Sequence, residues 1–274
     1  MVNIIKASGE IVSFDPNKIR QSLGRVGTDE KLIEQIVNEI SALLTENMTT
    51  HEIYRIVFRL LRKKSKVLSA KYHLKRAIML LGSTGYPFEK YIAELLRHQG
   101  YIANNNQIIK GFCVSHEVDV TAEEKEKLIF VECKYHNKLG IRCDVKISLY
   151  FKARFMDIEQ GYVNSKSKKL EGWLVTNTRF TDEALQYGQC AGLHLISWDY
   201  PQRNSLKEQI EVSGLYPVTC ITNFTKAEID DLLTNNIILC KSINDNPLIL
   251  ERLRIPKSRQ ATIIKQCQIL CSGL

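Results

Sequence analysis

The middle of the sequence reads Leu128-Ile129-Phe130-Val131-Glu132-Cys133-Lys134-Tyr135. Its β-branched and aromatic residues are typical of a strand, and we expect that strand to be half-buried. Because strand side chains alternate between two faces, Glu132 and Lys134 share one face, and the Cys133 side chain points into the core on the other. A charged pair at the end of an apolar strand is costly unless it is paired or bound to a metal ion.

Asp119 belongs to a second predicted strand, Val114 to Val120, and the charged stretch from Glu123 to Lys127 is expected to be the turn between the two. An antiparallel hairpin then brings Asp119 beside Glu132. Two convergent carboxylates form a hard oxygen site for Mg²⁺ or Mn²⁺. The neighbouring ammonium of Lys134 can hold or deprotonate an attacking water and stabilise charge growing on phosphorus. This is the chemistry that phosphodiester hydrolysis requires.

The Glu-x-Lys spacing is weak on its own, because a motif this short arises about once by chance in such a chain. Glu123 and Lys125 have the same spacing, but they lie in a polar turn. A structural salt bridge between Glu132 and Lys134 is the alternative explanation of the pair.

The segments around this hairpin predict an α/β sheet covered on both faces. We expect a helix from Phe88 to Gly100 and a long helix from Val145 to about Gly161. Further along, the pattern predicts a strand, a helix and a strand over Trp173–Thr176, Thr181–Cys190 and Leu193–Trp198.

Residues 86–200 resemble the Mrr-type branch of the PD-(D/E)xK restriction-endonuclease superfamily. The resemblance is carried, in order, by Phe88-Glu89, Glu94-Leu95-Leu96, Gly100-Tyr101, Gly111, Asp119, Glu132-x-Lys134-Tyr135, Val175-Thr176-Asn177 and Phe180-Thr181-x-x-Ala184. It implies that Asp119 and Glu132 hold the metal ion, that Lys134 is the catalytic lysine, and that Glu89 is an auxiliary carboxylate. The backbone carbonyl of Cys133 is a further candidate metal ligand.

His116 and Glu117 stand where many members of that family have a Gly-rich approach to the aspartate. They either join the site or only fix the hairpin. The basic series that follows is suited to positioning phosphates, with little sequence specificity; it comprises Lys138, Arg142, Lys146, Lys152 and Arg154.

The first 85 residues predict two short strands and a helical bundle. A hairpin over Ile4–Phe14 is followed by Asp15-Pro16, which suits the start of a helix. Thr49-Thr50-His51-Glu52 is a capping box for another helix, and a last helix ends at Gly82.

Residues 2–83 resemble the ATP-cone, the nucleotide-sensing module of ribonucleotide reductases and their repressor. The matching positions are Ile5-Lys6, Gly9, Phe14-Asp15-x-x-Lys18-Ile19, Thr50-x-x-Ile53, Tyr72, Ala77 and Leu81-Gly82. The resemblance implies a purine nucleoside triphosphate, ATP or dATP, as a regulatory ligand. The candidate binding residues are Lys6, Gly9, Lys18, Ile19 and Arg20, since a glycine turn and basic side chains accommodate phosphates. The sequence departs from the family at Ala7 and Ser8, where Arg and Asp are usual.

From about Leu206 the chain predicts short helices. They resemble helix-hairpin-helix DNA-binding units, but Asn235-Asn236 replaces the usual turn glycine, and a plain helical docking domain is the alternative. We therefore predict three domains: an ATP-cone-like domain over 1–85, a nuclease-like domain over 86–205 and a helical, possibly DNA-binding, domain over 206–274.

The 274 residues carry a net charge of +8, and residues 1–86 hold 14 Lys+Arg against 8 Asp+Glu. A basic first domain indicates an anionic partner, unless its charges merely solvate a helix face. The longest purely apolar run, Ala77 to Leu81, is too short to cross a membrane, and no secretory leader is visible, so we expect a cytoplasmic protein. The eight cysteines are expected to be reduced thiols, and neither Cys113/His116 nor Cys133/His136 matches a usual zinc spacing.

Together these features predict a Mg²⁺-dependent DNA endonuclease regulated by ATP or dATP, acting in restriction of foreign DNA or in repair. The alternative is a nucleotide-responsive DNA-binding regulator without cleavage activity. A third hypothesis gives the first domain a role in oligomerisation only; whether the chain is a homo-oligomer stays open.

Overall fold

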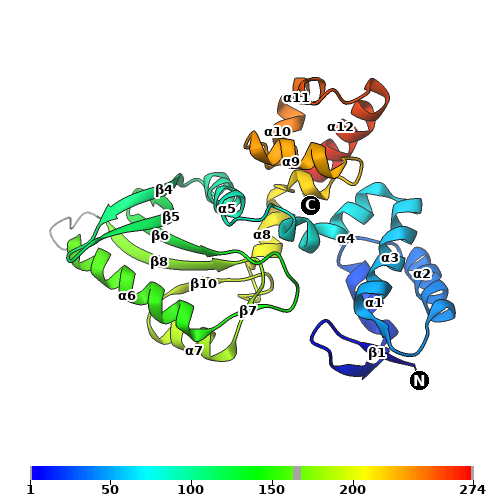
Figure 1. The fold of residues 1–274 in the computed structure, drawn as a ribbon, viewed down its shortest axis with the longest axis horizontal. Helices are drawn as coiled ribbons and strands as arrows, with labels where there is room; N and C mark the ends of the chain where they lie inside the picture. Colours follow the sequence, from blue (N-terminus) through cyan, green and yellow to red (C-terminus); the bar gives the residue numbers. More distant parts are fainter. Residues whose placement is uncertain (1, 163–167, 273–274) are drawn as a thin grey trace.

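The computed structural model describes residues 2–162 and 168–272. An N-terminal helical region, a central sheet with its helices, and a group of C-terminal helices meet around α4 and α8 (Figure 1). This arrangement confirms the predicted mixed α/β fold class. No helix in the described residues is long and apolar enough to cross a membrane.

The N-terminal region holds a small sheet and four helices. Strands β1 (Asn3–Ile5) and β2 (Ile11–Ser13) form the predicted hairpin, and β3 (Met48–Thr49), which the sequence did not indicate, pairs in parallel with β1. The Asp15 side chain accepts a hydrogen bond from the Asn17 N–H, and the capping box between Thr49 and Glu52 is confirmed. The helices are α1 (Pro16–Gly24), α2 (Glu30–Leu43), α3 (Thr50–Lys64) and α4 (Lys66–Met79).

The central sheet has the strand order β10-β8-β6-β5-β4. Its strands are β4 (Ile102–Lys110), β5 (Ser115–Glu124), β6 (Lys127–Lys134), β8 (Lys169–Thr176) and β10 (His194–Ile196). Strand β6 pairs antiparallel with β5 and in parallel with β8, and its residues Ile129 to Cys133 are all buried. The expectation of a half-buried strand was therefore wrong, because β6 lies in the middle of the sheet and helices cover both of its faces.

One face of the sheet packs on α5 (Tyr86–His98), and the other on α6 (Val145–Gly161) and α7 (Asp182–Cys190). On β6, Ile129 and Val131 join the core on the α5 side, whereas Phe130 joins the core on the α6 side. Two short strands, β7 (Arg142–Cys143) and β9 (Arg179–Phe180), pair in parallel outside this sheet.

The C-terminal helices share a hydrophobic core with α4 and α5. Thr219 Oγ1 donates a hydrogen bond to the Ala77 carbonyl at 2.7 Å, and the buried Tyr91 hydroxyl donates to the Leu215 carbonyl at 2.7 Å. Helix α4 is thus part of the C-terminal core, and the domain boundaries near 85 and 205 stay a prediction. The elements are α8 (Leu206–Ser213), the 3-10 helix η1 (Val218–Cys220), α9 (Lys226–Thr234), α10 (Cys240–Asp245), α11 (Leu248–Arg252) and α12 (Lys257–Cys271).

Gly161, the last residue of α6, allows the turn between β4 and β5 to pack against this helix. A Cβ atom at Gly161 would lie 2.9 Å from the Gly111 carbonyl carbon, whereas one at Gly24, the last residue of α1, meets nothing within 4 Å. We expect Gly161→Ala to lower the free energy of unfolding by about 1–3 kcal/mol through overpacking. Gly24→Ala is the matched control and should leave it unchanged or slightly raised. Urea unfolding of both variants measures the difference, and equal stabilities would contradict the contact.

Candidate functional site

Strands β5 and β6 stop pairing at the position of Asp119. The last backbone pair of their ladder is Val120 with Val131. Asp119 Oδ2 instead accepts a hydrogen bond from the Cys133 N–H at 2.7 Å. The predicted hairpin is confirmed, and the Asp119 carboxylate lies against the end of β6 because the strands separate there.

Glu132 is a buried carboxylate between two cations. Only 4% of the residue is exposed. Its Oε1 lies 2.9 Å from Lys134 Nζ, and its Oε2 lies 2.5 Å from Arg154 Nη1 on α6. Arg154 also donates to the Glu117 carbonyl. The shared face of Glu132 and Lys134 is confirmed, and Arg154, which the sequence suggested only as a phosphate contact, completes the group.

Three ionisable groups here have shifted pKa values. Burial, and then the charge of Glu132, raise the pKa of Asp119 to about 6, against the Cys133 N–H and the nearby cations. Burial and the charge of Asp119 raise the pKa of Glu89, which approaches from α5, to about 7. Burial disfavours the Lys134 ammonium, but the hydrogen bond to Glu132 together with the charges of Glu132 and Asp119 outweighs this and raises the pKa of Lys134. The predicted residues thus share one electrostatic environment, in which Lys134 is a protonated donor.

The oxygen donors of this group suit Mg²⁺, which is commonly bound through one or two carboxylates and retained waters. Asp119 Oδ1 accepts no hydrogen bond among the described residues. The raised pKa of Asp119 reports a desolvated carboxylate near another one, and a divalent cation would relieve that repulsion. Within residues 2–162 and 168–272, however, no three or more His, Cys, Asp or Glu are arranged as a ready ligand set. Each Glu132 oxygen already contacts one cation, so a metal ion held by Glu132 would compete with Lys134 or Arg154 for that oxygen.

The chain just after Lys134 is held by the end of β8. Thr176 Oγ1 donates to the Lys134 carbonyl at 2.7 Å. The fully buried Asn177 accepts from the His136 N–H at 2.9 Å and donates to the His136 carbonyl at 2.7 Å. Thr176 and Asn177 were among the residues that carry the Mrr-type resemblance, but no role was predicted for them. Polar residues at the end of an apolar strand are the signal that could have indicated this role.

His116 pairs with Asp157 and not with the carboxylates of Asp119 and Glu132. Its Nε2 lies 2.7 Å from Asp157 Oδ2, and the Cys113 N–H donates to Asp157 Oδ1 at 2.7 Å, so both residues tie the turn before β5 to α6. Glu117 contributes its backbone carbonyl to Arg154, and its side chain is among the charges that raise the pKa of Glu89. His136 Nε2 lies 3.3 Å from Cys143 Sγ. In the described residues, neither Cys113/His116 nor Cys133/His136 belongs to a group of three or more possible metal ligands.

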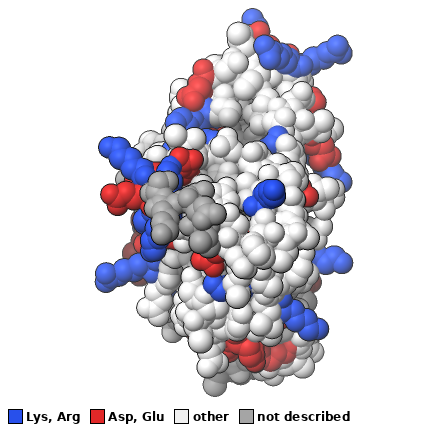
Figure 2. Space-filling view, turned by 90° about the vertical axis from the view of Figure 1, so that its left-hand side faces the viewer, with Lys and Arg blue, Asp and Glu red and all other residues white. Residues whose placement is uncertain are grey.

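The basic series does not form one surface. Lys152 lies 3.6 Å from Glu159 Oε2, and Arg154 is bound to Glu132, whereas Lys138 and Lys146 are exposed. The face of the molecule on the left of Figure 1 carries scattered Lys and Arg between wide areas of uncharged residues (Figure 2).

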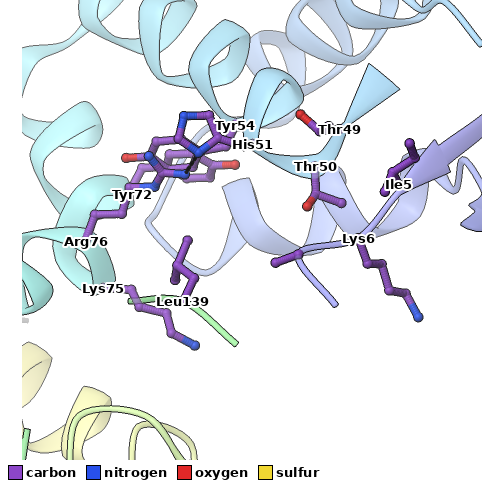
Figure 3. Close-up of a pocket in the computed structure, with 11 residues that line it drawn as sticks. Ile5, Lys6, Thr49, Thr50, His51, Tyr54, Tyr72, Lys75, Arg76 and Leu139 are labelled. Atoms are coloured by element: carbon purple, nitrogen blue, oxygen red, sulfur yellow. Dashed lines mark hydrogen bonds between the residues drawn. The ribbon is translucent and has the colours of Figure 1, made fainter. Parts of the chain in front are cut away.

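A second candidate site is a cavity of about 560 Å³ in the N-terminal region (Figure 3). It is lined by Ile5, Lys6, Ala7, Thr49, Thr50, His51, Tyr54, Tyr72, Lys75, Arg76 and Leu139. Leu139 comes from the loop that follows β6. This cavity therefore lies between the N-terminal region and the chain that continues from Lys134.

Among the predicted nucleotide-binding residues, Lys6 lines this cavity and the other four do not. Gly9 lies in the hairpin turn with φ 84°. Lys18 is exposed, Ile19 is buried in the helical core, and Arg20 pairs with Glu34 at 2.6 Å.

Aromatic residues form one wall of the cavity. The Tyr54 and Tyr72 rings stack with centroids 5.4 Å apart, and the Arg76 guanidinium lies 3.9 Å from the centre of the Tyr54 ring. The Tyr54 hydroxyl shares a 2.6 Å hydrogen bond with His73, whose pKa burial lowers to about 4. Tyr54 and Arg76 were missed in the sequence, although they lie four residues from Thr50 and from Tyr72 on their helices and so share a helix face with them.

Two family models match the chain. The ATP cone domain matches residues 2–78, which confirms that resemblance, and the C-terminal domain of AF1548-like proteins matches residues 216–271. An uncharacterized protein of Archaeoglobus fulgidus is 34% identical over 152 residues, which cover 56% of this chain and 83% of the relative. The chain belongs to the same family as this relative.

One similar solved structure is the crystal structure of the protein of unknown function AF1548. It is similar with a TM-score of 0.56 and 29% identity, over 70% of this chain and 100% of that one. The MspJI restriction endonuclease in complex with a 27-mer oligonucleotide is also similar, with a TM-score of 0.33 and 14% identity over 65% of this chain and 36% of that one. A TM-score this low does not by itself establish a shared fold.

The raised pKa of Asp119 predicts a pH-dependent cost in stability. A carboxyl whose folded-state pKa of about 6 exceeds its unfolded value destabilises the fold as pH rises from about 4 through 6. Asp119→Asn removes this cost, so at pH 7.5 without divalent ions we expect it to stabilise the chain by about 1 kcal/mol after solvent screening. Mg²⁺ should raise the Tm of the unmodified chain but not that of Asp119→Asn.

Thermal unfolding at pH 5 and pH 7.5 measures both effects. Glu124→Gln is the matched control, since Glu124 is an exposed carboxylate on the same strand. A Tm of Asp119→Asn that falls with pH as steeply as that of the unmodified chain would contradict the assignment.

Proposed function

We propose that the protein is a metal-dependent endodeoxyribonuclease whose activity is controlled by a purine nucleoside triphosphate bound to its ATP cone. The observation that carries the proposal is the meeting of Asp119, Glu132 and Lys134 where β5 and β6 separate. The Mrr-type resemblance of residues 86–200 supports the same reaction.

Asp119 and Glu132 would hold Mg²⁺, with the Cys133 carbonyl as a further oxygen ligand. Bound there, the ion would supply Lewis-acid polarisation of the scissile phosphate and a more acidic attacking water. Lys134 is protonated and hydrogen-bonded to Glu132, so its role is to orient the water and stabilise the negative charge that develops on the phosphate oxygens. Glu89, with a pKa of about 7, can accept a proton near neutral pH.

Arg154 neutralises Glu132 in the free protein. A phosphate backbone offers it a second anionic partner, so Arg154 could move from Glu132 to DNA and free one carboxylate oxygen for the metal ion. In this account, DNA and metal binding support one another.

The ATP cone supplies the regulatory ligand. The stacked Tyr54 and Tyr72 rings suit a purine base. Lys6 also lines the cavity, and because its ion pair with Glu10 is exposed, it can exchange Glu10 for a phosphate. Leu139 lies five residues after Lys134, so an occupied cavity can bias the arrangement of the loop that continues from the catalytic strand.

Removing a catalytic side chain should abolish cleavage. We expect Asp119→Ala and Lys134→Ala each to lower the rate of plasmid cleavage with Mg²⁺ or Mn²⁺ by at least about 100-fold, because each removes stabilisation that the transition state needs. Lys125→Ala is the matched control, since Lys125 belongs to the other Glu-x-Lys spacing, in the exposed turn after β5.

Equal background activity in all four proteins would contradict the nuclease. If those proteins still bind DNA in a nucleotide-dependent way, this result would favour the alternative hypothesis, a DNA-binding regulator without cleavage activity.

Substitutions at Lys6 and Lys18 distinguish binding in the cavity from binding elsewhere on the ATP cone. Both are basic side chains of the matched domain, but only Lys6 lines the cavity. We expect Lys6→Ala to weaken ATP or dATP binding about fivefold to tenfold and Lys18→Ala to change it less than twofold, by isothermal titration calorimetry. If the unmodified chain binds neither ATP nor dATP, the first domain is not a nucleotide sensor, and the hypothesis that it serves only in oligomerisation is favoured.

A further inference from the structure

A second cavity of about 380 Å³ adjoins the nucleotide cavity. It lies between the hairpin of the ATP cone, helix α4, and the β7 and β9 segments that follow β6 and β8. Its lining includes Ser8, Lys75, Gly140, Arg142 and Arg179. Lys75 and Leu139 line both cavities, so the two cavities are neighbours that share these side chains.

The second cavity holds an excess of positive charge. Arg142 and Arg179 are direct partners across the β7–β9 pair, where like charges are destabilising. Arg179 is bound to Asp199, but Lys75 and Arg142 have no carboxylate within ion-pair distance among the described residues. Burial and the charge of Arg179 lower the pKa of Lys75. Cations gathered without matching carboxylates favour an anionic ligand.

The basic groups of the nucleotide cavity itself are largely engaged. Lys6 lies 2.9 Å from Glu10, and Arg76 is held by the Tyr54 ring and by His51 at 2.8 Å. The hairpin turn contributes the uncharged Ala7. Lys75 has no ion-pair or hydrogen-bond partner in the described part of the chain, and its Nζ lies 5.6 Å from the centre of the Trp198 ring.

We propose that the second cavity is the polyphosphate half of the nucleotide site, with the base against Tyr54 and Tyr72 and the phosphates bound by Lys75 and Arg142. The proposal rests on nucleotide binding by the ATP cone, and adds that the ligand is completed by a residue outside residues 2–78. A triphosphate would then bridge the ATP cone and the segment between β6 and α6.

The bridge has a short route to the nuclease site. A Cβ atom at Gly140 would lie 4.0 Å from the Ala7 carbonyl, so the loop after β6 already packs on the hairpin of the cone. The Tyr135 hydroxyl donates to the Met79 carbonyl, at the end of α4, at 2.6 Å. Helix α4 therefore connects Lys75, in the second cavity, to Tyr135, which is the residue next to Lys134.

The test compares ATP with adenosine as ligands of the full chain, by isothermal titration calorimetry. We expect Arg142→Ala and Lys75→Met each to weaken ATP binding at least about tenfold while changing adenosine binding less than twofold, because only ATP carries the phosphates. Tyr54→Ala should weaken both ligands. Lys125→Ala, which removes a cation at the opposite end of β6, is the matched control and should change neither.

Thermal unfolding provides a second readout that needs no catalysis. Lys75→Met should raise the Tm without ligand, since it removes a half-buried cation, and should lose most of the Tm increase that ATP gives the unmodified chain. Two outcomes overturn this inference alone. Either ATP binds Arg142→Ala and Lys75→Met as tightly as it binds the unmodified chain, or the two substitutions weaken ATP and adenosine binding equally. No binding of either ligand by the unmodified chain overturns the nucleotide sensor as well.

Discussion

Burial of the Glu132 carboxylate constrains the rest of the site. A charge that is 4% exposed at the centre of an apolar sheet costs several kcal/mol unless it is matched by opposite charge and hydrogen bonds. Lys134 supplies one partner from the same strand, and Arg154 supplies the other from α6. Because β5 and β6 separate there, the Cys133 N–H has no partner in their ladder, and it donates a hydrogen bond to the Asp119 carboxylate instead. Lys134 and Arg154 thus neutralise Glu132, and both are cations that a phosphate could also bind.

Helix α4 joins this site to the ATP cone. Its middle carries Tyr72, Lys75 and Arg76 into the nucleotide cavity, and the Met79 carbonyl at its end binds the Tyr135 hydroxyl. The same helix packs on the C-terminal helices through Ala77, whose carbonyl accepts from Thr219. A ligand that shifts α4 would therefore act on the segment that follows β6 and on the C-terminal region together. Two functional regions that are distant in sequence thus share one structural element.

Local rules predicted most of the fold and part of the site. Alternation in Leu128–Tyr135 put Glu132 and Lys134 on one face, and caps at Asp15 and Thr49 placed helix starts correctly. Pairing on both sides of β6 could not be derived from that segment, because it depends on β8, whose paired residues lie 42 positions later in the chain. Arg154 was assigned to phosphate because the sequence gives the charge of α6 but not the residue it meets. Lys18 was chosen by resemblance and Arg20 for its charge, whereas the cavity is lined by residues of the hairpin, of α3 and of α4, and by Leu139.

The most direct test of the account is a crystal structure of the chain soaked with Mn²⁺, using anomalous scattering to locate the ion. The account predicts one strong anomalous peak between the carboxylates of Asp119 and Glu132, with Lys134 or Arg154 moved off one Glu132 oxygen. A structure in which Glu132 keeps both cations and no ion lies beside Asp119 would contradict it, and would leave the Glu132, Lys134 and Arg154 group as a structural ion-pair network.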